Sequence, residues 1–368
     1  MKLNPFRIEE FYGVHEFTAS HMLSSSDVES RSIQALLQLE PDALDAFLNL
    51  KLGYTEAPGA PELRQEIARQ YTGLEADQVL VFSCAEEAIF VFYQALFGPE
   101  DHLMVVTPCY ESGLELARST GASVSVWERQ MEDGWVYHVS ALERQLQPNT
   151  RAIYLNTPNN PTGTQMDRET FQDLCALAEE KGIWLFSDEV YRGLEHDASS
   201  MLPAACEVTF KGVSVGSMSK SFGLPGLRLG WIACQDRDLL RKLQSFKFYT
   251  TICNSAPSEF LTTLALRHAS EILQENRKLV LSNLALLQGF MQRHQDMFDW
   301  VPPQGSPIAF PRLKSGNASE FCRQVLEKTG ILLLPGEVYD QPEHFRIGYG
   351  RKHFPEVLGL FEGFLKGH

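Results

Sequence analysis

A lysine directly after an apolar run is the residue of this chain best suited to covalent chemistry. Lys220 lies in Ser217-Met218-Ser219-Lys220-Ser221, at the end of a run that begins at Val213. Burial and nearby cations lower the pKa of a lysine, and the neutral amine is the form that attacks a carbonyl group. Arg228, further along the same stretch, offers a planar fork of N–H donors that suits phosphate. An exposed loop lysine is the commoner meaning of such a pattern, so the prediction of a Schiff-base lysine depends on the rest of the chain.

Three other stretches place polar side chains where apolar runs end. Asn160, in Asn156-Thr157-Pro158-Asn159-Asn160-Pro161-Thr162-Gly163, can point its amide at a phenolic or carboxylate oxygen. Asp188 ends Trp184-Leu185-Phe186-Ser187-Asp188, and a buried carboxylate there needs a cationic partner such as a protonated pyridine nitrogen. Ser83 is expected to cap the next helix, whose free amides would cradle a phosphate. Each stretch alone also fits a turn or a helix cap, so their combination carries the prediction.

The combination resembles the aspartate aminotransferase superfamily, that is, the class I/II aminotransferases of fold type I, which depend on pyridoxal 5'-phosphate (PLP). The resemblance covers nearly the whole chain, from Tyr54 to Arg346. It rests on the order and spacing of Asn160, Asp188, Tyr191, Ser217, Lys220 and Arg228. It implies PLP as the cofactor and a homodimer whose two subunits share their active sites.

The resemblance also implies a role for each catalytic residue. Lys220 is expected to hold PLP as a Schiff base and to move protons during the reaction. Asp188 is expected to pair with the pyridine nitrogen and to keep it protonated. Asn160 and Tyr191 are expected to hydrogen-bond the ring oxygen of the cofactor. Arg346 and Asn160 are expected to bind the substrate, and Arg346 to grip its α-carboxylate.

The remaining cofactor contacts follow from the same resemblance. Tyr110 is expected to stack on the ring, and Tyr54 to reach the phosphate of the neighbouring subunit. Cys84 departs from the family's pattern, because glycine or another small residue is usual there. Glu86 brings a carboxylate next to the phosphate, so its side chain must turn away or be paired. The phosphate itself is expected to be held by the backbone amides or side chains of Ala85, Glu86, Ser217, Ser219 and Arg228.

The expected activity is the transfer of an amino group from a small L-amino acid to a 2-oxo acid. The same fold supports cyclases, lyases and oxidase-type enzymes. Lys247–Ser255 is similar to a branch of the family near capreomycidine synthase, which cyclises an arginine derivative. A distant alternative is a serine acyl-enzyme, because Ser217-Met218-Ser219-Lys220 matches S-x-x-K and Lys328-Thr329-Gly330 matches K-T-G, although the chain has no S-D-N triplet. A PLP-binding regulator is disfavoured, because the residues before Tyr54 show no basic helix-turn-helix pattern.

Composition narrows the class of protein and its setting. The net charge is −15, from 32 basic and 47 acidic residues, which argues against nucleic-acid binding. The seven cysteines occur singly without a CxxC pair, so we expect no metal site and a reducing cytoplasm. No apolar run is long enough for a signal peptide or a spanning helix. The sequence therefore predicts a soluble cytoplasmic enzyme.

Short apolar runs that alternate with amphipathic stretches predict an α/β fold with a mostly parallel seven-stranded sheet flanked by helices. The connection from Ser217 to Leu229 is too short for a crossover helix, so the last strand is expected to run antiparallel or to lie far from the sixth. The seven runs are Gln78–Phe82, His102–Val106, Ser123–Trp127, Arg151–Asn156, Ile183–Asp188, Val213–Ser217 and Leu229–Cys234.

The character of the chain changes after Cys234, where helical patterns over Asp238–Lys247 and Ser258–Leu287 lead into a smaller α+β unit. We predict a large PLP-binding domain over residues 45–255. Residues 1–44 and 256–368 are predicted to form the small domain. The segment Glu16–Asp27, especially Ser24, Ser25, Ser26 and Asp27, is expected to form the entrance to the site.

Overall fold

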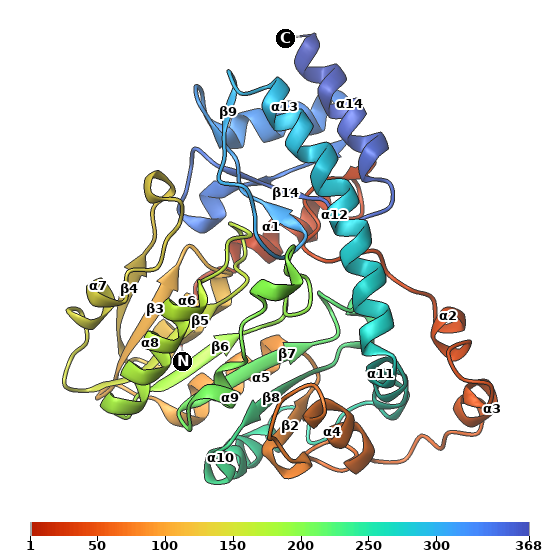
Figure 1. The fold of residues 1–368 in the computed structure, drawn as a ribbon, viewed down its shortest axis with the longest axis vertical. Coiled ribbons are helices and arrows are strands. Elements are labelled where there is room, and N and C mark those ends of the chain that lie inside the picture. The colour runs from red at the N-terminus through yellow and green to blue at the C-terminus, as the bar shows by residue number, and fades with distance from the viewer. Residues whose placement is uncertain (1, 368) are drawn as a thin grey trace.

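A seven-stranded mixed sheet forms the centre of the larger part of the molecule (Figure 1). This computed structural model describes residues 2–367. The strand order is β2-β8-β7-β6-β5-β3-β4, and β8 runs antiparallel to both neighbours while the other pairs are parallel. The predicted fold class is confirmed, and the last strand is antiparallel but lies beside the sixth. The strands are β2 (Val79–Phe82), β3 (His102–Thr107), β4 (Ser123–Glu128), β5 (Thr150–Asn156), β6 (Trp184–Asp188), β7 (Gly212–Ser217) and β8 (Gly230–Cys234).

The central strands are continuously apolar because helices cover both faces of the sheet. Successive side chains of a strand point to opposite faces. In β3, Leu103 and Val105 pack in one core with helices α5 and α10, whereas Met104 and Val106 pack in another with α8. The helices around the sheet are α4 (Pro61–Ala68), α5 (Ala85–Leu96), α6 (Glu111–Ser119), α7 (Val139–Glu143), α8 (Arg168–Lys181), α9 (Ala205–Val208) and α10 (Arg237–Lys247).

The C-terminal part contains two helices where the sequence predicted one over Ser258–Leu287. Helix α11 (Ala256–Arg267) and helix α12 (Ala269–Arg293) meet at His268, whose φ of −106° and ψ of 22° lie outside the helical range. Neither Pro nor Gly marks this break, so helical periodicity continues across it. The remaining helices are α13 (Ala318–Thr329) and α14 (Phe354–Lys366), and the short strands are β9 (Phe298–Asp299), β10 (Ile308–Ala309), β11 (Arg312–Leu313), β12 (Ile331–Leu332), β13 (Leu334–Pro335) and β14 (Phe345–Gly348).

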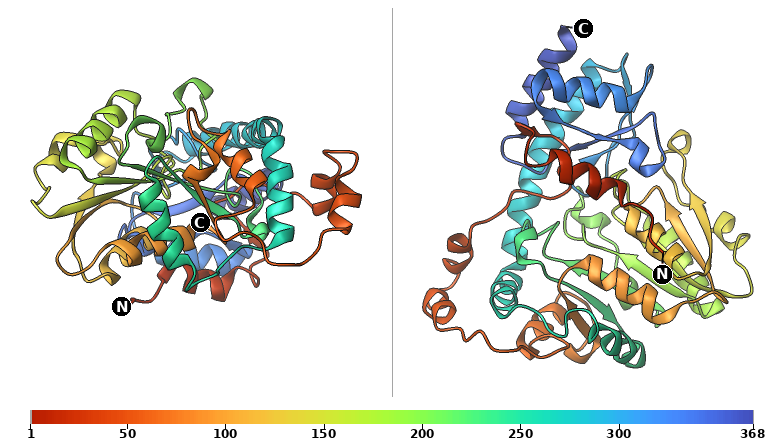
Figure 2. Two further views of the ribbon diagram at one scale, coloured as in Figure 1. Left: turned by 90° about the horizontal axis from the view of Figure 1, so that it is seen from below. Right: turned by 180° about the vertical axis from the view of Figure 1, so that it is seen from behind.

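The N-terminal segment packs against this C-terminal part. Helix α1 (Arg7–His15) lies between the upper part and the sheet (Figure 2), and strand β1 (His21–Met22) pairs in parallel with β12. The predicted recruitment of N-terminal residues by the C-terminal unit therefore has a structural basis. The domain limits at residues 45 and 255 stay a prediction.

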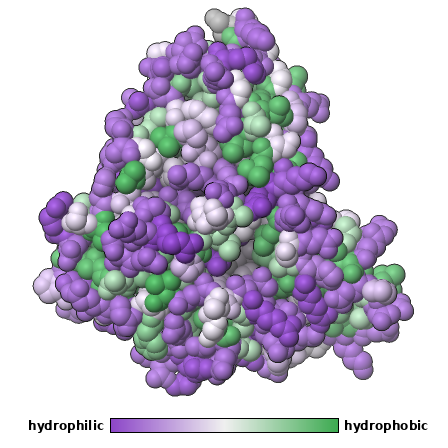
Figure 3. Space-filling view, in the orientation of Figure 1, coloured by the Kyte–Doolittle hydropathy of each residue, from purple (hydrophilic) through white to green (hydrophobic). Residues whose placement is uncertain are grey.

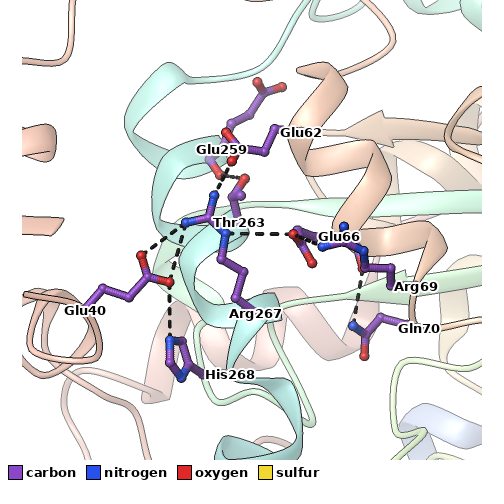
Figure 4. A network of polar contacts seen from close by, with 9 residues as sticks. All are labelled: Glu40, Glu62, Glu66, Arg69, Gln70, Glu259, Thr263, Arg267 and His268. Carbon is purple, nitrogen blue, oxygen red and sulfur yellow. Dashed lines mark hydrogen bonds and ion pairs between the residues drawn. The ribbon is translucent and has the colours of Figure 1, made fainter. Parts of the chain in front are cut away.

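Helices α2 (Ile33–Leu37) and α3 (Ala43–Leu48) stand away from the body as an arm, which both views of Figure 2 show. Arg267 of α11 ties the base of this arm to the body through ion pairs with Glu40 (3.2 Å), Glu62 and Glu66 (3.8 Å) (Figure 4). The arm also packs on the body through the buried Leu36, Leu37 and Ala43, whereas Leu44 and Leu48 are exposed.

The face of the molecule in Figure 3 is mostly hydrophilic, and its apolar side chains lie in separate groups. Within residues 2–367, no helix combines the length and the apolar character that a membrane crossing requires.

Candidate active site

A cavity of about 480 Å³ opens where three neighbouring strands end. Asn156 of β5, Asp188 of β6 and Ser217 of β7 are the last residues of their strands, and all three line it. Ligands of open α/β sheets bind at this end of the strands. The cavity also contains Lys220 and most of the predicted site residues, so the topology brings together what the sequence separates.

Lys220 and Asp188 lie in the same cavity wall with few polar partners. The Nζ of Lys220 donates a hydrogen bond to the Oγ of Ser26 (2.7 Å), and burial lowers the pKa of this amine. The carboxylate of Asp188 accepts hydrogen bonds from the hydroxyl of Tyr154 (3.1 Å) and the amide of Val190 (3.2 Å). Burial raises the pKa of Asp188 to about 6, against the effect of these bonds and of Lys220. Within residues 2–367, no cation lies at ion-pair distance from this buried carboxyl.

Arg346 of β14 is 2 % exposed and is surrounded by neutral oxygens. Its guanidinium donates to the Oδ1 of Asn160 (3.0 Å), the hydroxyls of Tyr339 (2.6 Å) and Tyr12 (2.7 Å), and the carbonyl of Ser24 (2.8 Å). Among residues 2–367, no carboxylate forms an ion pair with it. Arg346 and Asn160 are therefore adjacent, as their predicted common role in substrate binding requires.

The turn before α5 has the shape of an anion cradle, with one correction to the prediction. The N-cap of α5 is Cys84 and not Ser83, because the Sγ of Cys84 accepts the hydrogen bond of the Glu87 amide (3.4 Å). The amides of Ala85 and Glu86 open the helix, where backbone N–H groups have no acceptor within the helix. A methyl group at Gly230 would lie 2.5 Å from the Ala85 nitrogen, so β8 packs tightly behind the turn.

The side chain of Glu86 turns into the cavity and does not leave it. Burial raises the pKa of Glu86 to about 7, and the nearby Asp188 and Glu9 act in the same direction. A raised pKa makes this carboxyl easier to protonate, and the expectation that it turns away from a phosphate or is paired stays a prediction.

Three of the other predicted cofactor residues line the cavity, and Tyr54 does not. Ser219, Tyr110 and the exposed Arg228 line the cavity, and Arg228 donates to the carbonyl of Pro225 (3.0 Å). Tyr54 is 94 % exposed and does not line this chain's own cavity.

The N-terminal segment supplies residues that sequence reasoning did not assign. The hydroxyl of Tyr12 bonds Arg346, and Glu9 accepts a hydrogen bond from the hydroxyl of Tyr110. The expected entrance segment does line the cavity, since Glu16, Ser25, Ser26 and Asp27 are part of its wall. Asp27 is held by both its oxygens to Arg351 (2.8 and 2.9 Å). Helical spacing of Glu9, Tyr12 and Glu16 is the signal that could have pointed to this wall.

The residues present fit PLP. The hydroxyl of Tyr191 is buried, lines the cavity and has no hydrogen-bond partner in the described part of the chain, which leaves a donor for a ring oxygen. Asp188 lacks the cation that a protonated pyridine nitrogen supplies, and Lys220 has the lowered pKa of an amine that joins an aldehyde. The cradle at Ala85 and Glu86 is the place for a phosphate.

Comparison with known proteins agrees with this geometry. The family model of aminotransferase class I and II matches residues 22–354. Capreomycidine synthase of Streptomyces vinaceus is 28% identical over 93% of this chain and 88% of its own length. A PLP-dependent aminotransferase from Streptococcus suis has a TM-score of 0.94 at 30% identity, over 100% of this chain and 98% of its own.

A second solved structure, the PLP-dependent cyclase OrfR, has a TM-score of 0.91 at 28% identity, over 100% of this chain and 98% of its own. The match of the family model includes the strand ends around the cavity and Lys220, and it begins after Glu9, Tyr12 and Glu16 of the cavity wall. The chain therefore belongs to the PLP-dependent aminotransferase class I and II family, with the aspartate aminotransferase fold.

Proposed function

We propose that the protein transfers the amino group of an L-amino acid to a 2-oxo acid in the cavity around Lys220. The observation that carries the proposal is the buried guanidinium of Arg346, whose described partners are all neutral. A buried cation without an anion is costly, and the α-carboxylate of an amino acid or an oxo acid supplies one through two parallel hydrogen bonds. Both substrates of a transamination carry that carboxylate.

The residues around Lys220 have separate roles in the proposed reaction. When bound, PLP supplies an electron sink that stabilises negative charge at the substrate Cα. Arg346 and Asn160 hold the carboxylate, which orients the Cα–H bond toward Lys220. The Nζ of Lys220 takes the proton from Cα and returns it later, and its lowered pKa suits an amine that must be neutral to do so. Asp188 would hold the ring nitrogen of PLP and keep it protonated through its negative charge.

We also propose a homodimer with shared sites. Tyr54 is 94 % exposed at the end of the arm, next to Leu52 and Leu48, which are 81 % and 71 % exposed. A surface tyrosine after two exposed leucines is expected to be covered by a second copy, and two-fold pairing is the commonest oligomer symmetry. A partner's Tyr54 could then complete the phosphate site beside the exposed Arg228.

Subunit mixing tests the shared site. Tyr54→Ala and Lys220→Ala homodimers should both be inactive, whereas a mixed dimer contains one site with an intact lysine and the partner's intact tyrosine. We expect mixtures to regain activity. Two inactive parents that stay inactive after verified mixing, or an active monomer in sedimentation, would exclude the shared site.

A cyclase is the second candidate, because capreomycidine synthase and the cyclase OrfR are similar to this chain over nearly its whole length. The deciding experiment incubates the purified protein with ¹⁵N-labelled amino acids and an unlabelled 2-oxo acid. Transamination moves ¹⁵N into a new amino acid. Retention of ¹⁵N in a cyclic product, without amination of the oxo acid, would support the cyclase and refute the transaminase.

A further inference from the structure

Some carboxylates of the cavity wall have no ion-pair partner among the described residues. Each cation of the wall has a task or a partner: Lys220 reacts, Arg228 lies at the phosphate cradle, and Arg351 is paired with Asp27. Glu9 and Glu16 line the same cavity, and neither forms an ion pair with any residue of the described chain. The wall therefore carries negative charge that the protein itself does not neutralise.

Helix α1 and its C-cap residue Glu16, which keeps helical φ and ψ, present these two carboxylates on one side. Glu9, Tyr12 and Glu16 are spaced by three and four residues, so they follow one another along the side of the helix that faces the cavity. At 1.5 Å per residue, Glu9 and Glu16 lie about 4.5 and 6 Å from Tyr12 along the axis. A side chain that starts near Tyr12 can reach either carboxylate.

The helix is fixed in place. Arg7 forms ion pairs with Glu111 and Asp340, both at 2.9 Å, and Ile8 is 1 % exposed. Burial raises the pKa of Glu16, and the charges of Glu9 and Asp27 act in the same direction, against those of Arg351 and Lys220. These carboxylates are held near one another by the fold, and a cation between them would relieve their repulsion.

Arg346 is the observation that points to a charged substrate here. It donates to Asn160 and Tyr12, which line the cavity, and no carboxylate of residues 2–367 pairs with it. Tyr12 bonds Arg346 directly, so the anchored end of a substrate lies in the middle of the acidic face of α1. The other end of the substrate must then pass Glu9 or Glu16.

We propose that the substrate is an amino acid whose side chain ends in a cation, a guanidinium or an ammonium group, and that Glu9 and Glu16 select it. The inference rests on the proposed function, since it takes the α-carboxylate to be bound at Arg346. The alternative is a substrate with an anionic side chain that binds Arg351. In that case Arg351 would have to give up the two hydrogen bonds that it donates to Asp27.

Matched pairs of substrates isolate the charge. L-Citrulline has nearly the shape of L-arginine but a neutral end group, and L-norleucine has a methyl group in place of the ammonium group of L-ornithine. We expect the wild-type protein to favour the charged member of at least one pair in kcat/KM by tenfold or more. Glu9 and Glu16 are exposed, so removing their charges should reduce that preference by about threefold to tenfold, since exposed charge pairs are individually weak.

The variants are Glu9→Gln with Glu16→Gln, which keep the size and the acceptor for Tyr110 but remove the charge. The control is Glu10→Gln on the same helix, because Glu10 is exposed and does not line the cavity. The preference for the cationic substrate should fall in the double variant and stay in the control.

Three results overturn the inference: equal rates for both members of each pair, preference for L-glutamate, or an equal loss in Glu10→Gln. Failure of the proposed function looks different. In that case no amino acid of any charge transfers its nitrogen to a 2-oxo acid, and the ¹⁵N experiment is negative throughout.

Discussion

Replacement of Arg346 by lysine tests the substrate anchor most sharply. The guanidinium donates five hydrogen bonds to Ser24, Asn160, Tyr339 and Tyr12. A lysine keeps the charge but has three donors and no planar fork. Truncation of one side of a buried charge pair costs about 2–5 kcal/mol, which corresponds to roughly one and a half to four decades in kcat/KM for amino acids.

The same replacement also affects stability, so it needs a control. At least two hydrogen bonds to a charged group are lost, at about 1.5–3 kcal/mol each, and the melting temperature should fall. Tyr339→Phe removes one of these bonds and the bond that Tyr339 donates to Asn160 (2.9 Å), but it keeps the guanidinium and the Asn160 side chain, so it should be less stable while its KM changes by less than about fivefold.

The assay compares saturation by amino acids, PLP absorbance and melting temperature in the three proteins. Arg346→Lys should keep PLP and lose saturation. Wild-type saturation in Arg346→Lys would refute the anchor and make simple amines substrate candidates.

Three further predictions concern the cofactor side of the cavity. Asp188→Asn should retain the fold and lower turnover by two or more decades, since a lost buried charge partner costs about 3–5 kcal/mol; near-normal turnover would give Asp188 another role. In the PLP-free protein the folded pKa values of Asp188 and Glu86 are raised to about 6 and about 7, so their contribution to stability is present below the unfolded values and is lost as pH rises through the folded ones. Melting temperature should therefore fall between about pH 4 and pH 8, and Asp188→Asn with Glu86→Gln should flatten that slope in calorimetry; an unchanged slope contradicts the assignment. Gly230→Ala should weaken PLP binding in an absorbance titration, because the new methyl group meets the Ala85 nitrogen at 2.5 Å, and unchanged affinity would mean that the turn relaxes freely.

The residues at strand ends could be predicted from the sequence because the sheet dictates where they lie. Asn156, Asp188 and Ser217 each end a buried run, and parallel strands bring such ends to one edge. Lys220 and Arg228 follow the last of these ends within a short connection. Order along the chain therefore translates directly into nearness in space.

The residues from the chain termini could not be predicted in this way. Tyr12 and Arg346 are separated by 334 positions and meet only because β1 pairs with β12 and α1 closes over the cavity. Two local features could not be predicted from the sequence either. Cysteine is not among the residues that usually cap a helix N-terminus, and neither Pro nor Gly marks the break at His268.

The central claim is that Lys220 carries the cofactor. Reduction of the purified protein with borohydride, digestion and mass analysis of the peptides tests it directly. We expect a yellow protein and a pyridoxyl-phosphate adduct on Lys220, with no adduct in Lys220→Ala. A protein that stays colourless after PLP is added, or an adduct confined to another lysine, would contradict it.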